Sequence, residues 1–400
     1  MEDRLVHPPD TVTITDNALL HAAIVAGHGD IVRDVLDNRS WPTEETRDNI
    51  ELLSWAADYG AYAVIHDLLG GYLPTWGDRA SEGTVRTVLE IARSWVGVDP
   101  VAELRRRLGD EAAVVTRETV PVEGDLTHAD RVRVTTADGR WAEVQTTHLG
   151  IVTYIEDRLG TVVSRDALLA RALTNPDTDS VDWSQAWFSV GNMPDVEATY
   201  HWAAGLLADS DPEVRRFAAE VVAMLSRNEE PCREEALAIL RARMPVEPNA
   251  EILSALIDAF GNYQLSGDMP EVEAHIGHPD PRVRRQVAEA LINKVTDAAS
   301  AARAIRLLTE LGSDSSSQVR STVVRVLRDH APDSPVTRQL LASGRDDPDP
   351  EVRLEALAGL ARYRDAPAYE QLRRLADEAG EDSHAWWLAY DVERHLRTAD

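Results

Sequence analysis

A mostly α-helical solenoid, built from helix-pair repeats of two kinds, is the fold that the sequence predicts. Near the N-terminus, Leu20–Leu36 and Leu53–Leu69 match without a gap at a spacing of 33 residues. In the C-terminal half, four helix starts share one pattern: Asp or Ser, two further residues, Val and Arg. Between the halves, residues 131–145 alternate apolar and polar positions around a tight-turn signal. These observations predict two repeat arrays with a small β-hairpin insertion.

The N-terminal matches, LHAAIVAGHGDIVRDVL and LSWAADYGAYAVIHDLL, each predict a short helix, a glycine turn and a second helix. Gly27 and Gly60 fall at the turn, where a left-handed backbone would be costly for a residue with a side chain. A third unit, Leu89–Leu108, keeps this order but needs one extra residue before Gly97. These units resemble ankyrin repeats, whose LHxAAxxGHxxIVxxLL signature the first follows closely. The resemblance implies an ankyrin-like block over residues 1–111.

Residues 112–164 interrupt the helical pattern. RVRVTTADGRWAEV alternates on both sides of Asp138-Gly139, a dipeptide favoured in two-residue hairpin turns. HLGIVTYIEDRL then resembles the second half of another ankyrin unit. The sequence leaves two interpretations open: a hairpin inserted into the ankyrin-like block, or a small connecting subdomain.

The C-terminal pattern places Asp211, Asp280, Ser316 and Asp349 at the N-caps of four helices. The three aspartates are followed by proline, which is tolerated at the first helical position because its missing N–H has no partner there. The valines of the pattern lie 69, 36 and 33 residues apart, so the first interval holds a degenerate unit around PNAEILSALIDAFGNY. A weaker unit around DSVDWSQAWFSVGN precedes them, which gives about six units in all.

These units resemble HEAT repeats of the short, phycocyanobilin-lyase-like type, in which D-P-x-V-R opens the second helix. The resemblance covers residues 165–400 and implies a curved solenoid with a concave inner surface, closed by a C-terminal capping helix. The arginine of each pattern is expected to be structural and to pair with an aspartate of its own or the neighbouring repeat. The alternative is a basic ladder along the concave face. The residues concerned are Arg215, Arg284, Arg320 and Arg353.

Composition restricts the function. The chain has 69 acidic and 41 basic residues and a net charge of −28, which repels a nucleic-acid backbone and favours a basic or neutral partner. Cys232 is the only cysteine, so an internal disulfide or a thiolate zinc cluster is excluded. With no phosphate-binding loop, HExxH or GxSxG motif, we expect no catalytic residue, metal or cofactor. Without a signal peptide or an apolar run of membrane length, a cytoplasmic location is expected.

Aromatic residues are the candidate contacts for a partner, because Trp and Tyr bury a large area at low entropic cost. Alternatively, Trp183, Trp187, Tyr200 and Trp202 fill the join between the two repeat systems, and Trp386 or Trp387 seals the final repeat. The candidates are Trp183, Trp187, Tyr200, Trp202, Trp386 and Trp387.

The predicted function is a non-catalytic scaffold or adaptor, of a regulatory or immunity type, that binds another protein or peptide on the concave surface. The alternative is a groove-based enzyme or small-molecule binder, similar to bilin lyases or to alkylpurine DNA glycosylases, with Asp182 and Asp195 as the carboxylates to examine. His275 with His278, and the acidic run Asp346–Glu351, are interpreted as loop and capping residues rather than metal sites.

Overall fold

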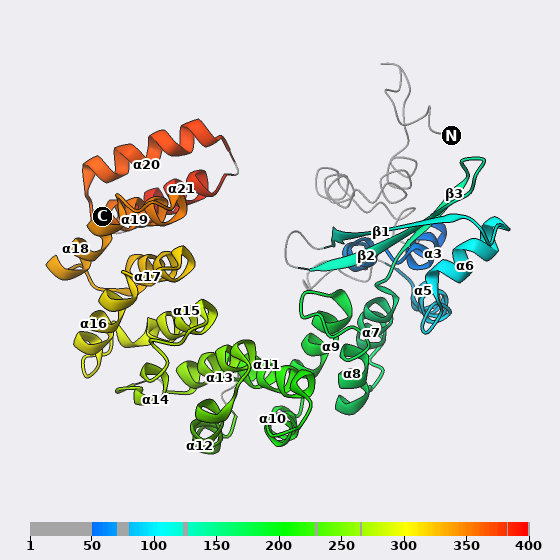
Figure 1. Cartoon of the computed structure of the whole chain (residues 1–400), viewed down its shortest axis with the longest axis horizontal. Helices are drawn as coiled ribbons and strands as arrows, with labels where there is room; N and C mark the ends of the chain where they lie inside the picture. Colours follow the sequence, from blue (N-terminus) through cyan, green and yellow to red (C-terminus); the bar gives the residue numbers. More distant parts are fainter. Residues whose placement is uncertain are drawn as a thin grey trace. The chain divides into compact units, whose positions relative to one another are not determined.

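The protein was analysed as a computed structural model that describes residues 50–69, 80–122, 127–228, 231–264, 266–381 and 383–398 (Figure 1). The chain forms two compact units, Met1–Met193 and Pro194–Asp400. The first predicted repeat, Leu20–Leu36, lies outside the described residues. The predicted domain boundaries at 111 and 164 fall inside the first unit and remain a prediction.

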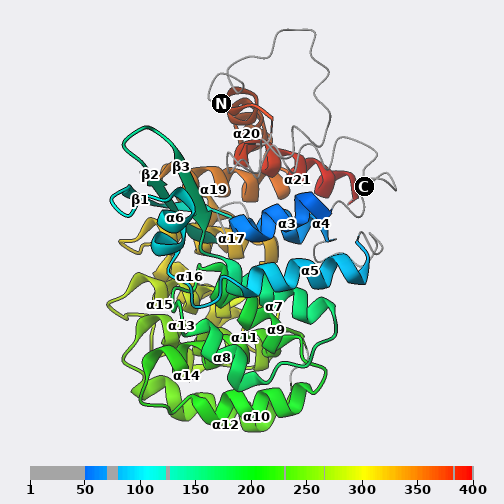
Figure 2. The ribbon, with the colours of Figure 1, turned by 90° about the vertical axis from the view of Figure 1, so that its right-hand side faces the viewer.

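The first unit combines helices with one sheet. Within the described ranges, two helix pairs precede the sheet and three further helices follow it (Figure 2). Its described elements are α3 (Ile50–Tyr59), α4 (Tyr62–Leu68), α5 (Glu82–Arg93), α6 (Pro100–Leu108), β1 (Val114–Pro121), β2 (His128–Thr135), β3 (Trp141–Gln145), α7 (His148–Arg158), α8 (Arg165–Ala172) and α9 (Val181–Gly191).

The turn between α3 and α4 requires glycine. Gly60 has a φ of +78°, and a Cβ placed there would lie 2.1 Å from the carbonyl oxygen of Gln145. Thr147, two residues after Gln145, also contacts this turn, because its hydroxyl donates to the Gly60 carbonyl at 2.5 Å. The helix–glycine–helix order of the second predicted repeat is therefore present, and its Gly60 turn packs against the end of β3. The ankyrin-like assignment itself remains a prediction.

The sheet is antiparallel, with the order β1-β2-β3. The predicted hairpin is confirmed: β2 and β3 pair from Arg131↔Gln145 to Thr135↔Trp141, around a turn in which Gly139 has a φ of +85°. β1 is an additional strand that sequence reasoning did not predict. Helix α6 lies against the sheet (Figure 2). The core between them is formed by Trp95, Leu104, Ala113, Val132, Val134 and Val144.

The second unit is entirely helical in its described part. Its elements are α10 (Val196–Leu206), α11 (Pro212–Asn228), α12 (Arg233–Arg243), η3 (Met244–Val246), α13 (Ala250–Tyr263), α14 (Pro270–Glu273), α15 (Pro281–Ala290), η4 (Ile292–Lys294), α16 (Ala301–Leu311), α17 (Ser317–His330), α18 (Pro335–Gly344), α19 (Pro350–Arg362), α20 (Ala366–Ala379) and α21 (His384–Thr398).

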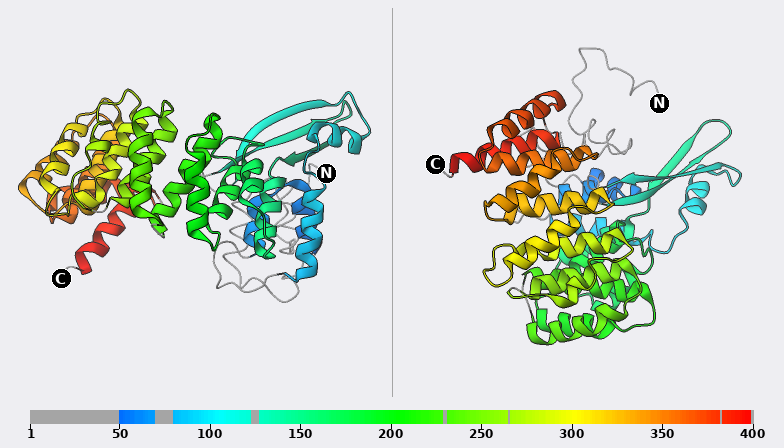
Figure 3. Two further views of the ribbon diagram at one scale, coloured as in Figure 1. Left: turned by 90° about the horizontal axis from the view of Figure 1, so that it is seen from below. Right: turned by 60° about the vertical axis from the view of Figure 1, so that its left-hand side comes forward.

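These helices form two layers. Helices α11, α13, α15, α17 and α19 pack successively on one another along the inner side of the curve, and α10, α12, α14, α16 and α18 form the outer side (Figure 1). Figure 3 shows the same succession as a stack of helices. The predicted helical solenoid is confirmed for this unit, and the degenerate repeat is its helix α13. None of the helices in the described ranges has the length and apolar character needed to cross a membrane.

One polar arrangement repeats at the starts of the inner helices. Arg284 donates from Nε and Nη2 to the carboxylate of Asp314, at 2.6 and 2.7 Å, and from Nη1 to the backbone carbonyls of His278 and Pro279. Arg320 pairs in the same way with Asp347, and Arg215 with Glu247. Each arginine therefore joins its own turn to the next repeat.

The acids of these pairs are not the N-cap aspartates named from the sequence. Asp280 and Asp349 accept from N–H groups of the first turn of their own helices. The paired acid stands two residues before the next cap and also accepts the N–H of that cap residue, as Asp314 does from Ser316 and Asp347 from Asp349. Arg353 donates to the carbonyls of Asp347 and Pro348.

The arrangement is interrupted once. Helix α13 carries Leu253 where its neighbours carry arginine, and the following repeat carries His278 where an acid would stand. His278 Nδ1 still accepts the N–H of Asp280 at 3.1 Å, so the capping role survives without the ion pair. Both halves of the pair are absent together, which avoids leaving one buried charge without its partner.

Candidate partner-binding surface

The aromatic residues predicted near the middle of the chain are divided between the two units. Trp183 and Trp187 lie on α9 of the first unit, whereas Tyr200 and Trp202 lie on α10 of the second. Trp183 and Tyr200 are each only 1% exposed, so neither offers surface to a partner in this structure. Trp187 and Trp202 are half-buried, and Trp202 packs edge-to-face on Phe217 at 6.4 Å.

The C-terminal aromatics lie at the surface of helix α21. Trp387 and Tyr390 are each 51% exposed, and Trp386 is partly exposed. Trp386 stacks on Tyr390 with ring centroids 5.6 Å apart, and Trp387 meets Trp386 edge-on at 4.9 Å. Of the candidates from sequence, Trp386 and Trp387 are therefore the ones that combine exposure with mutual packing, and Tyr390 joins them.

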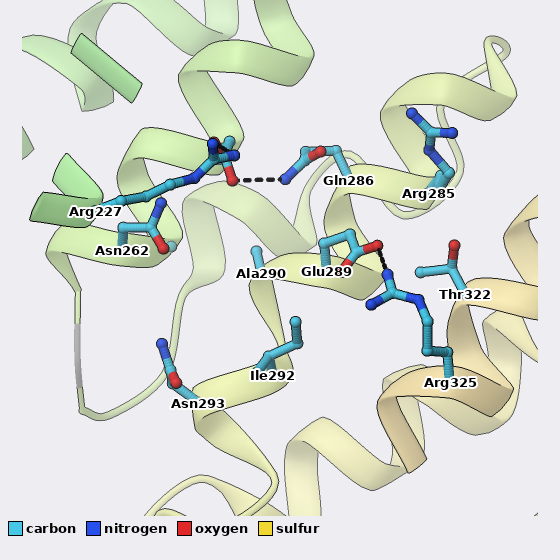
Figure 4. A pocket seen from close by; sticks show the side chains of 12 residues that line it. Arg227, Asn262, Arg285, Gln286, Glu289, Ala290, Ile292, Asn293, Thr322 and Arg325 are labelled. Carbon is cyan, nitrogen blue, oxygen red and sulfur yellow. Dashed lines mark hydrogen bonds and ion pairs between the residues drawn. The ribbon is translucent and has the colours of Figure 1, made fainter. Parts of the chain in front are cut away.

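A pocket with a volume of about 670 Å³ opens on the inner layer of the second unit, between α11, α13, α15 and α17 (Figure 4). Helices α13 and α15 approach closely at its base, because Gly261 has no side chain: a Cβ there would lie 2.9 Å from that of Ala290. Sequence reasoning missed this site, since its residues come from repeats up to about a hundred positions apart.

Three arginines and two carboxylates line the pocket. Arg227 pairs with Asp258 at 2.5 Å, and Gln286 donates to the same carboxylate at 3.1 Å. Arg325 pairs with Glu289, as the dashed line in Figure 4 marks. Burial raises the pKa of Asp258 despite these partners. Two ion pairs thus balance four of the five charges.

The fifth charge is Arg285. This exposed guanidinium makes no hydrogen bond or ion pair within the part of the chain that the structure describes, and it stands on α15 beside Gln286 in Figure 4. Asn262 and Asn293 add amide groups from two successive repeats. A pocket of this volume with an unpaired guanidinium and several amides suits a polar or acidic side chain of a partner.

The carboxylates considered for an enzyme have structural roles. Asp195 caps helix α10 by accepting from the N–H of Ala198 at 3.0 Å. Asp182 accepts from the N–H of Gly150 at 2.7 Å, and burial raises the pKa of Asp182 to about 6. They belong to different units, and no aromatic ring is among the described residues that line the pocket.

The comparisons with known proteins bear on the second unit. A family model described as HEAT repeats matches residues 199–292 and 305–389. The second unit contains HEAT repeats. The match covers less than half of the chain and includes all four inner helices that line the pocket. The finer resemblance to the phycocyanobilin-lyase-like type is not part of that match and remains a prediction.

Solved structures with some similarity include the Escherichia coli protein YibA, which is 18% identical, with a TM-score of 0.42 over 53% of this chain and 75% of that chain. An engineered protein is 20% identical, with a TM-score of 0.35 over 52% of this chain and 98% of its own. Another engineered protein is 14% identical, with a TM-score of 0.37 over 96% of this chain and 98% of its own. No curated protein matches the chain. Similarities this low carry no argument about function.

Proposed function

We propose that the second unit is a scaffold that binds another protein without catalysing a reaction, and that the inner-layer pocket anchors that partner. The observation that carries this proposal is Arg285, an exposed guanidinium without a partner among the described residues, in a pocket otherwise neutralised by two ion pairs. HEAT repeats support it, because stacked helix pairs present an extended surface rather than a single catalytic cleft.

The partner that fits combines two charge properties. The net charge of −28 attracts a basic protein over long range and raises its association rate, whereas it leaves a neutral protein unaffected. At close range, the single excess positive charge of the pocket accepts one acidic side chain of that partner. A carboxylate bound by Arg285 makes a charge-assisted hydrogen bond, and adjacent amides such as Asn293 complete its contacts.

Crosslinking with mass spectrometry, on the full chain in its source cell, tests the proposal. A crosslinker that joins acidic side chains is suitable, because Lys294 is the only lysine and is buried. The proposal predicts inter-protein crosslinks from inner-layer acids such as Glu251 and Glu289. Crosslinks confined to the outer helices, or to the first unit, would contradict it.

Small-molecule binding is the second candidate, and the volume of the pocket supports it. Titration of the full chain with small mono- and dicarboxylic acids separates the two functions. The scaffold proposal predicts binding no tighter than about 1 mM for such acids, because an exposed ion pair contributes little by itself. Micromolar binding of a small acid that also displaces the protein partner would favour the alternative.

A further inference from the structure

Four side chains that bind metals in other proteins gather on the outer layer of the second unit, away from the pocket. Glu197 and His201 lie four residues apart on α10 and therefore share one face of that helix. Cys232 is the N-cap residue of α12, and Glu235 lies in the first turn of the same helix. The chain's only cysteine thus faces its neighbouring outer helix.

The two separations from His201 are close to those of a tetrahedral metal site. His201 Nε2 lies 3.6 Å from Cys232 Sγ and 3.7 Å from Glu197 Oε1, and the three atoms all lie within 4.8 Å of one another. Zinc bonds of ~2.3 Å to sulfur and ~2.0 Å to nitrogen or oxygen, at tetrahedral angles, put ligand atoms about 3.3–3.6 Å apart. One ion can therefore reach all three atoms with small side-chain adjustments.

The fourth side chain lies near the other ring nitrogen of the histidine. His201 Nδ1 lies 3.6 Å from Glu235 Oε1, on the opposite side of the ring from Cys232 and Glu197. A carboxylate at Nδ1 favours the tautomer that keeps the proton there and leaves the Nε2 lone pair free for an ion. Such carboxylate–histidine pairs are the usual support of zinc-binding histidines.

The cluster carries two carboxylates beside a neutral thiol, a set of groups that a dication would bind. Burial raises the pKa of the Cys232 thiol, and the nearby carboxylates of Glu197 and Glu235 raise it further. A bound dication reverses this balance, because it is the largest local charge and deprotonates a coordinating thiol. Glu197, Glu235 and Cys232 approach the two ring nitrogens of His201, and the ring of Tyr200 meets the His201 ring edge-on at 5.4 Å.

We propose that Glu197, His201 and Cys232 bind one divalent transition-metal ion of the zinc class, with Glu235 as the positioning residue for His201. Thiolate and imidazole ligands favour zinc over magnesium or calcium. Binding forms one bond from the metal to each of the three side chains and releases the Cys232 thiol proton to solvent. The fourth position is left to water or to a side chain of a partner, and the ion joins the outer helices of two successive repeats.

Titration of the full chain with Co²⁺ tests this proposal, because a thiolate bound to Co²⁺ gives a charge-transfer band in the near ultraviolet. The proposal predicts one Co²⁺ per chain with that band, displacement of Co²⁺ by Zn²⁺, and affinity that rises with pH as the thiol deprotonates. Cys232→Ser abolishes the band. Glu235→Gln leaves the band but weakens affinity by about 10- to 100-fold.

His275→Asn is the matched control, because His275 also lies in the second unit but outside the cluster. It should bind Co²⁺ like the unaltered chain, whereas His201→Asn should not. Circular dichroism of each variant checks that it is folded. No charge-transfer band at saturating Co²⁺ in the unaltered chain, or a band that survives in folded Cys232→Ser, would overturn the proposal. Equal loss of affinity in His275→Asn and His201→Asn would overturn it too.

Discussion

The two units hold their polar groups in different ways. In the first unit, the polar contacts between distant parts of the sequence differ from one another: the Tyr59 hydroxyl donates to Glu143, and the Tyr62 hydroxyl donates to Gln185. Buried Glu156 receives Arg93 at 2.8 Å and Arg171 at 2.7 Å. In the second unit, one arginine–acid–cap arrangement recurs along the inner layer. A repeated contact can be lost at one place, as at Leu253 and His278, whereas these contacts of the first unit are not repeated among its described residues.

The largest expected effect concerns the turn of the first unit. Gly60→Ala should destabilise the fold by about 3 kcal/mol or more, because it adds a left-handed alanine and a clash with the Gln145 carbonyl. Gly109→Ala is the matched control: Gly109 has a φ of +67° with nothing within 4 Å of its Cβ position, and should cost only about 1 kcal/mol. Denaturant unfolding measures both. Equal losses would show that the close packing at Gly60 is unimportant.

The first unit should also respond to mild acid through His148. Burial lowers the pKa of His148 to about 4, below the value of 6.5 for the unfolded chain. As pH falls from 6.5 to 4, the unfolded chain therefore takes up a proton that the folded unit does not, and about 3 kcal/mol of stability is lost. Asp58 opposes the lowering of the His148 pKa, and Arg107 adds to it. Asp182 acts in the opposite sense: because burial raises its pKa to about 6, its protonation stabilises the folded unit over part of the same pH range.

The contribution of His148 is isolated by comparing the intact chain with His148→Gln. The difference in unfolding free energy between the two should fall by about 3 kcal/mol between pH 7.5 and 4. The ion pairs of the second unit behave differently, because Arg284 lowers the pKa of Asp314 and Arg320 lowers that of Asp347. Their stabilisation is present above pH 4 and lost only below it. A pH-independent difference for His148→Gln would contradict the account.

A smaller loss is expected from one ion pair of the second unit. Arg284→Ala leaves Asp314, whose side chain is only 9% exposed, without its cation and should cost about 2 kcal/mol. Arg306→Ala is the control, because Arg306 is exposed on α16, and should cost less than about 0.5 kcal/mol. Denaturant midpoints of the two variants provide the measurement. Similar midpoints would mean that the repeated pair contributes little stability.

The smallest effect is expected from building the missing pair. Leu253→Arg and His278→Asp should each destabilise, since each introduces half of a buried ion pair. Combined, they should show a favourable coupling free energy of about 1 kcal/mol in a double-mutant cycle. Purely additive losses would contradict the view that the repeat at α13 has lost a complete pair.

Much of the fold could be predicted from local patterns. The D-P-x-V-R starts identify inner helices because capping is a property of a few neighbouring residues, and Asp138-Gly139 identifies the β2–β3 hairpin for the same reason. Strand β1 was missed, because VVTRETVP lies at an exposed edge and has no clear alternation. Pairing of Arg284 and Arg320 with an aspartate of their own or the neighbouring repeat was expected, but Asp314 and Asp347 were not named, since the choice of acid depends on how successive repeats stack.

The candidate sites were harder to predict. Arg227 and Arg325 line one pocket only because four repeats stack along the inner layer. In the metal cluster, the pair Glu197 and His201 is visible in the sequence as residues four apart on a helix. Cys232, however, joins them only because α10 and α12 are neighbouring outer helices. Local patterns thus identify elements, and the packing of the second unit assembles the sites.

The most direct test of the scaffold proposal is a pair of charge reversals at the two faces of the second unit. Arg285→Glu alters the inner pocket and Arg306→Glu the outer helix α16, and both residues are exposed, so both variants should fold. With the partner identified by crosslinking, we expect Arg285→Glu to weaken its binding at least about tenfold, and Arg306→Glu to change it less than about twofold. Equal affinities of the two variants, or a greater loss with Arg306→Glu, would contradict binding through the inner surface.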